Sequence, residues 1–183
     1  AVVFVETEVN SGKYAIYQVD TVICDALVEN CCYLLEHLGA EMCEVDRELV
    51  IVYGNDVASV VKEQHPDLSV SIVEYQKIDN RGDLQRKGEI LCTLAKTLEP
   101  FENRFKGTEF NALCTDTTML FNNIGARHAL KSDDKVSFQF MTMKKEDLEK
   151  WYDNAFQMFL ACMSVLPYLD VKGKLKTIKS GKE

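Results

Sequence analysis

The chain has 183 residues, which is enough for one domain with a sizeable core or for one domain with an appendage. Hydrophobic residues make up 46% and charged residues 27%, values typical of a globular protein, and the apolar runs are too short to span a membrane. The net charge of −8 is uneven, because residues 171–183 carry five Lys and one Glu (+4) and residues 1–170 therefore carry −12. An acidic body disfavours broad binding to phosphate backbones, which needs clustered cations.

The cysteines indicate a reduced protein without a metal site. Seven are present without a C-x-x-C pair, and only three histidines accompany them. Zinc-site spacing is therefore absent, and we expect neither a metal nor a cofactor. Most of the cysteines lie inside apolar patterns, which favours buried thiols in a cytoplasmic protein. The chain begins at Ala1 without a Met, as a processed chain or a fragment would, so a fused or neighbouring domain can lie beyond the termini.

In chain order, the first expected element is a short β-hairpin in residues 2–20. Apolar and polar residues alternate there around a Ser-Gly turn. A helix is expected next, from an N-cap at Asp20 to a stop at Gly39. The apolar residues of this helix recur at helical spacing: Leu27, Cys31, Leu34 and Leu38.

Residues 48–76 allow two interpretations. The segments ELVIVYG, NDVASVVKEQH and LSVSIVEYQ can form a strand, a helix and a strand, which would be a small α/β unit. They can equally form two helices that are separated at residues 65–67. Short apolar runs do not distinguish the two interpretations, but the spacing of Val57, Val60 and Val61 favours helices.

The C-terminal half predicts three long amphipathic helices. The first begins at Asp83 and ends near Pro100, and its apolar stripe is Leu84, Leu91, Leu94, Leu98 and Phe101. The second has the stripe Phe110, Leu113, Thr117, Leu120 and Ile124. After a polar link at residues 131–135, the third begins at a Thr142 cap and ends at Pro167. Its stripe is Leu148, Trp151, Tyr152, Ala155, Phe156, Phe159, Met163 and Leu166.

These patterns predict a mainly α fold, a helical bundle of long amphipathic helices with a short N-terminal β-hairpin. An α+β fold is the alternative, and it depends on how residues 48–76 fold. The expected organisation is an N-terminal helical or small α/β region in residues 1–79, a helical bundle in residues 80–170 and a basic tail in residues 171–183. A Lys/Gly/Ser tail is typical of a solvated terminus or a linker.

The densest polar cluster lies in MLFNNIGARHAL, residues 119–130, at the expected end of the second helix. It contains Asn122, Asn123, Arg127 and His128. A histidine can move a proton near neutral pH, and an arginine can hold a phosphate and stabilise developing negative charge. Metal-independent RNA cleavage needs little more, because the 2′-hydroxyl of the substrate is the nucleophile. Residues 123 and 127, four apart, would share one helix face.

A structural role is the alternative for the same cluster. Arg and His are favoured near a helix C-terminus by the macrodipole, and they can bond the last carbonyls. Asn side chains often cap or cross-link helices through hydrogen bonds. The chain has no P-loop, G-x-G-x-x-G or G-x-S-x-G pattern, so neither nucleotide hydrolysis nor serine hydrolase chemistry has support.

Three successive segments in residues 80–168 resemble a known family. They are GDLQRKGEILCTLAKTLEP, then LFNNIGARHAL, then MKKEDLEKWYDNAFQMFLACM. Together they resemble the helical HEPN-type domains of bacterial abortive-infection and related defence proteins. The resemblance implies a helical bundle, a homodimer and metal-independent endoribonuclease activity. It assigns Arg127 and His128 to the Arg-His element and Asn123 to the Asn of that element. In the superfamily the Arg stands four to six residues before the His, whereas here the two are adjacent.

Two hypotheses of function follow. In the first, a HEPN-like domain of a defence-type system binds or cuts RNA through Asn123, Arg127 and His128, with His128 as the proton carrier and Arg127 as the phosphate ligand. In the second, the chain is a non-catalytic helical module for dimerisation or partner binding, in which the same residues lock the bundle. The polar cluster and the basic tail favour the first. The acidic body and the adjacent Arg and His favour the second.

Overall fold

The computed structural model describes residues 2–9, 12–19, 21–45, 47–125 and 135–179, with side chains from residue 25 onward. The chain divides into two compact units, unit 1 (Ala1–Gly54) and unit 2 (Asn55–Glu183). The division that we predicted after residue 79 therefore falls within unit 2.

Unit 1 opens with the β-hairpin that the sequence predicts. β1 (Val2–Val9) pairs antiparallel with β2 (Gly12–Val19), from Val2 opposite Val19 to Val9 opposite Gly12. The helix α1 (Thr21–His37) follows. Gly39 has a φ of 66°, a left-handed conformation that glycine adopts at low cost, so this helix ends where its sequence predicts.

The second hairpin of unit 1 corrects part of the sequence interpretation. β3 (Ala40–Val45) pairs antiparallel with β4 (Glu48–Tyr53), from Ala40 opposite Tyr53 to Val45 opposite Glu48. The favoured helical interpretation is wrong for residues 48–53, which form this strand. Leu, Val and Ile fit a pleated, half-buried surface, and the preceding β3 supplies a pairing edge that local spacing does not reveal.

The first helices of unit 2 confirm the other part of that interpretation. α2 (Asp56–Gln64) and α3 (Ser69–Gln76) are separated by a 3-10 turn, η1 (Pro66–Leu68). Asn55 caps α2, because its Oδ1 accepts a hydrogen bond from the amide of Ala58 at 2.9 Å. The break falls at Pro66, whose ring removes an amide donor and disfavours helix in the preceding residue.

A second short turn, η2 (Ile78–Asn80), leads into α4 (Leu84–Leu98). The helix begins where the sequence predicts, and Asp83 caps it, since its Oδ1 accepts a hydrogen bond from the amide of Arg86 at 2.9 Å. The chain then turns through η3 (Glu99–Phe101) and α5 (Glu102–Phe105).

The last helices are α6 (Asn111–Asn123), α7 (Lys135–Met141) and α8 (Lys145–Lys179). The short α7 was not predicted. Thr142 does not cap α8, because its hydroxyl donates to the carbonyl of Phe138 at 3.0 Å at the end of α7. The predicted end at Pro167 is also wrong, since α8 continues through this proline.

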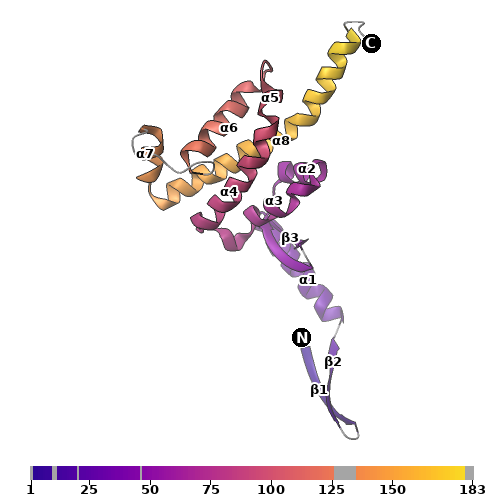
Figure 1. Cartoon of the computed structure of the whole chain (residues 1–183). Helices are drawn as coiled ribbons and strands as arrows, with labels where there is room; N and C mark the ends of the chain where they lie inside the picture. The colour runs from indigo at the N-terminus through magenta and orange to yellow at the C-terminus, as the bar shows by residue number, and fades with distance from the viewer. Residues whose placement is uncertain (1, 10–11, 20, 46, 126–134, 180–183) are drawn as a thin grey trace. The chain divides into compact units, whose positions relative to one another are not determined.

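The helices of unit 2 share one core, and α8 contacts α2, α4, α5 and α6 (Figure 1). The buried face of α8 consists of Ala155, Phe156, Phe159, Leu160, Cys162, Met163 and Leu166. The predicted stripes of α4 and α6 supply most of the opposing side, with Leu91, Leu94, Leu98, Leu120 and Ile124 all nearly inaccessible to solvent. The mainly α bundle with an N-terminal hairpin is thus confirmed.

Candidate functional site

The helix-end cluster is divided by the actual end of α6. Asn122 and Asn123 are the last residues of this helix, and Gly125 has a φ of 82° that breaks the helical path. Arg127 and His128 lie outside the described residues. The expectation that residues 123 and 127 share one helix face therefore extends outside the described residues, and the described part of it is that α6 ends at Asn123.

Both polar groups of Asn123 bond within the protein. Its Nδ2 donates to the carbonyl of Met119 at 2.8 Å, and its Oδ1 accepts from the hydroxyl of Ser137 at 3.1 Å. Ser137 lies on α7, so this amide joins two helices that flank residues 126–134. The neighbouring Asn122 has a buried Oδ1 without a hydrogen-bond partner among the described residues.

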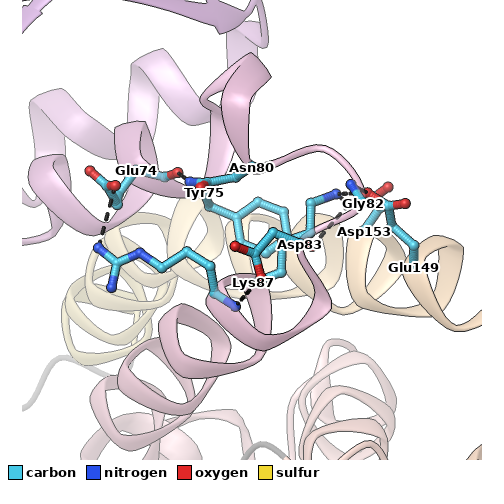
Figure 2. A network of polar contacts seen from close by, with 9 residues as sticks. Glu74, Tyr75, Asn80, Gly82, Asp83, Lys87, Glu149 and Asp153 are labelled. Atoms are coloured by element: carbon cyan, nitrogen blue, oxygen red, sulfur yellow. Dashed lines mark hydrogen bonds and ion pairs between the residues drawn. The ribbon is translucent and has the colours of Figure 1, made fainter. Parts of the chain in front are cut away.

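The strongest polar cluster of the described residues lies elsewhere, around Lys87 on α4 (Figure 2). The side chain of Lys87 is only 8% exposed. Its Nζ donates to Oε1 of Glu149 and to Oδ1 of Asp153, both at 2.8 Å and both on α8. This lysine is therefore a buried cation held between two carboxylates of the central helix.

Tyr75 on α3 completes the cluster. Its hydroxyl donates to Oδ1 of Asp153 at 2.9 Å, and the Nζ of Lys87 lies 5.3 Å from the centre of its ring. The same ring stacks against Phe156, with centroids 4.1 Å apart. One aromatic side chain thus joins the polar cluster to the hydrophobic core.

The loop before α4 is attached to Glu149 on α8 and to Glu74 on α3. The amide of Gly82 donates to Oε1 of Glu149 at 2.8 Å. Nδ2 of Asn80 donates to the carbonyl of Glu74 at 2.5 Å. The carboxylate of Glu74 in turn pairs with Arg86 at 3.3 Å. These contacts hold η2 and the first turn of α4 against α3 and α8.

Electrostatics favour the ionised form of this arrangement. Burial raises the pKa of Glu149, but the hydrogen bonds from Lys87 and from the Gly82 amide outweigh burial and hold the pKa below its ordinary value. Burial, and then the negative charge of Asp153, raise the pKa of Tyr75 far above the usual range of a phenol. The cluster therefore contains a neutral tyrosine and an ionised Glu149 at neutral pH.

This geometry is that of a structural clamp. The ammonium of Lys87 is enclosed by two carboxylates and an aromatic face, so it is not accessible to a substrate. Within the described residues, no group of three or more His, Cys, Asp or Glu side chains is placed to hold a metal ion. We call Tyr75, Lys87, Glu149 and Asp153 the Lys87 clamp.

The sequence analysis did not select Lys87 as a site residue, and the structure buries its side chain near the start of α4. A signal was present. Lys87 stands four residues before Leu91 and three after Leu84, at the place where the apolar stripe of α4 would continue. On α8, Glu149 and Asp153 are four residues apart and Phe156 follows at helical spacing. A lysine within the apolar stripe of one helix and carboxylates beside the stripe of another indicate a buried ion pair between the two helices.

A third feature is the end of α8, where the helix extends beyond the core of unit 2 (Figure 1). We call residues 168–179 the α8 extension. It exposes 49% of Tyr168, 53% of Val171, 47% of Leu175 and 75% of Ile178. The spacing of these residues is three, four and three, which is the a/d spacing of a heptad repeat. They lie within an arc of about 80° on the helix surface.

Side chains from α5 and from the loop before α6 support the start of this extension. Arg104 donates to the carbonyl of Leu166 at 3.2 Å and pairs with the carboxylate of Asp170. Lys172 binds Oε1 of Glu109 at 2.6 Å. These contacts account for the continuation of the helix past Pro167, since they stabilise the turns on both sides of the proline.

Comparisons with protein-family models, with curated proteins and with solved structures find no match for this chain. Among the helices that the structure describes, none is long and apolar enough to cross a membrane.

Proposed function

We propose that this chain is a non-catalytic helical module that binds a helix of another protein through the α8 extension. The observation that carries this proposal is the exposed stripe of Val171, Leu175 and Ile178 on a helix that has already passed its own core. A helix in a protein normally buries its apolar stripe, and heptad spacing is the pattern that a second helix covers. Full burial of one such side chain contributes about 1.5–3 kcal/mol.

The contacts of Asn123 also support a structural role for the helix-end cluster. Its amide is occupied by Met119 and Ser137, so it links α6 to α7, as the second hypothesis expects. RNA cleavage through Arg127 and His128 stays a prediction, and so does the homodimer that the resemblance implies.

The binding activity is tested with a designed helical peptide of three heptads that carries Leu at a and d and Gln at e and g. The isotope-labelled protein is titrated with this peptide to millimolar concentration, and NMR peak shifts are followed. We expect saturable shifts confined to the α8 extension. Leu175→Gln should weaken binding at least tenfold, because it removes the central apolar contact. Thr177→Gln, on the opposite side of the same helix, should change binding less than twofold. A wild-type protein without saturable shifts would contradict the proposal.

The absence of catalysis is tested with a mixed RNA pool in EDTA. We expect no cleavage by the wild-type protein and no difference from His128→Ala. Cleavage that His128→Ala abolishes, with the melting temperature unchanged, would show a ribonuclease and overturn the non-catalytic assignment.

A further inference from the structure

We infer that the partner of the α8 extension is an acidic amphipathic helix, one that carries Glu or Asp on both sides of its own apolar stripe. This inference rests on the proposed function and adds the chemistry of the partner. It is drawn from the positions of the lysines relative to the exposed stripe.

The lysines flank the stripe at the positions that a partner helix approaches. With Leu175 at position a and Ile178 at position d, Lys174 takes position g and Lys179 takes position e. Lys172 takes the e position of the preceding heptad. In a coiled coil, e and g side chains pair across the interface and set the choice of partner. Lys172 is already paired with Glu109, so Lys174 and Lys179 are the lysines that select a helix with carboxylates at its own e and g positions.

One such pairing already exists inside the protein. Lys172 binds the carboxylate of Glu109, and the same carboxylate accepts a hydrogen bond from the hydroxyl of Tyr168 at 3.4 Å. The hydrogen bond from Lys172 holds the pKa of Glu109 below its usual range. A carboxylate beside the stripe is thus the group that this surface already accepts. Lys174 and Lys179, both exposed, extend the same preference further along the helix.

Two other occupants fit the extension less well. A second extension from another copy would place lysines against lysines, which is destabilising at e and g positions. The stripe also argues against RNA, because the aliphatic Val171, Leu175 and Ile178 between the lysines offer neither stacking platforms nor hydrogen bonds to bases. An acidic helix satisfies both the stripe and the lysines.

The experiment compares three peptides with Leu at a and d, and with Glu, Gln or Lys at e and g. Each is titrated against the full chain at low salt and at 1 M salt, where the Debye length is about 3 Å. We expect the Glu peptide to bind at least about fivefold more tightly than the Gln peptide, and the Lys peptide to bind most weakly. This preference should largely vanish at high salt.

Lysine variants separate the flanking charges from the net charge. The double variant Lys174→Gln/Lys179→Gln should bind the Glu and Gln peptides with nearly equal affinity. Lys176→Gln, at position b and away from the stripe, should keep most of the preference. Equal loss in both variants would mean that only net charge matters, and it would overturn the inference.

The remaining outcomes distinguish this inference from the proposed function. Equal binding of the Gln and Glu peptides overturns the inference and leaves the proposed function intact, whereas no binding of any peptide overturns both. Self-association in ultracentrifugation that Leu175→Gln abolishes would identify a second copy as the occupant. Sedimentation with phosphatidylserine vesicles that Leu175→Gln abolishes, without peptide binding, would identify a lipid surface. Either result overturns the inference.

Discussion

Lys87 is a charged residue at a position where the apolar stripe of α4 would otherwise continue. Removing an ammonium group from water is costly, and the cost is recovered only when paired charges and hydrogen bonds surround it. Glu149, Asp153 and the ring of Tyr75 supply these contacts. The pairing also fixes how α4 is aligned along α8, because an ion pair tolerates a shifted register less well than aliphatic contacts do.

Lys87→Met should therefore lower the free energy of unfolding by about 3 kcal/mol, because it leaves two carboxylates and a tyrosine without their cation. The measurement is urea unfolding followed by far-UV circular dichroism at neutral pH. Lys96→Met, at an exposed position of the same helix, is the matched control and should change stability by less than about 0.5 kcal/mol. Similar effects of the two variants would mean that the clamp contributes little.

Glu149 should give the stability of the protein a dependence on pH. Its pKa in the folded state lies below the ordinary value of 4.5, so the folded protein binds fewer protons here than the unfolded chain. The resulting stabilisation is complete above that ordinary value and is lost as the pH falls through the folded pKa. Glu149→Gln should be less stable than wild type at pH 7, and the difference should shrink below pH 4.5. Urea unfolding across this pH range measures the difference in stability, with the exposed Glu146→Gln as control. A difference that is constant with pH would refute the linkage.

At the scale of elements, the sequence predicts a helix most accurately when its apolar stripe is long and its capping residue is adjacent in sequence. α4 follows from its leucines and from Asp83, and the break at Pro66 follows from proline geometry. β4 was misassigned because a short apolar run has no period of its own and depends on pairing with β3. The end of α8 was misplaced because Arg104 and Glu109, distant in sequence, stabilise the helix around Pro167.

The candidate sites were predictable to different degrees. Asn122 and Asn123 do lie at a helix end, as their sequence indicates. Gly125 then separates them from Arg127 and His128, and a positive φ in a loop does not show in helical periodicity. The Lys87 clamp could have been found from charges that interrupt two stripes. Glu149 and Asp153, however, lie more than 60 residues from Lys87 in the sequence. Only the packing of α4 against α8 identifies them as its partners.

Gly88, within α4, should tolerate a side chain with a gain in stability. A Cβ added there would lie 3.5 Å from Cε2 of Tyr152, which is ordinary van der Waals contact. Glycine inside a helix costs about 0.5–1 kcal/mol relative to alanine, so Gly88→Ala should raise the free energy of unfolding by about that amount. Thermal melting measures it. Gly173→Ala, in α8 with no atom within 4 Å of the added carbon, controls for propensity alone. A lower melting temperature for Gly88→Ala only would reveal a steric conflict with Tyr152.

At the scale of the whole molecule, the two units differ in how many apolar side chains they bury. Among the residues whose side chains the structure describes, the hydrophobic core cluster lies in unit 2 and draws on α2 through α8. In unit 1, large apolar side chains of α1 and of the turn that follows it are exposed: Leu27, Val28, Tyr33, Leu34 and Leu38. Two-stranded hairpins are marginally stable alone, so the stability of the chain resides mainly in unit 2.

A fragment of residues 55–183 should therefore fold by itself. Its first residue, Asn55, caps α2 and bonds to Gln157 on α8 at 3.1 Å, so the start of the fragment has its own contacts. We expect cooperative thermal unfolding by circular dichroism, within a few degrees of the main transition of the full chain.

A fragment of residues 80–183, which begins near the division predicted from sequence, is the informative control. It lacks Val61, Ile72 and Tyr75, all buried in the shared core, and it should lose cooperative unfolding because their removal opens the core beside α8. Cooperative folding of the shorter fragment, or failure of the longer one, would contradict this assignment of the core.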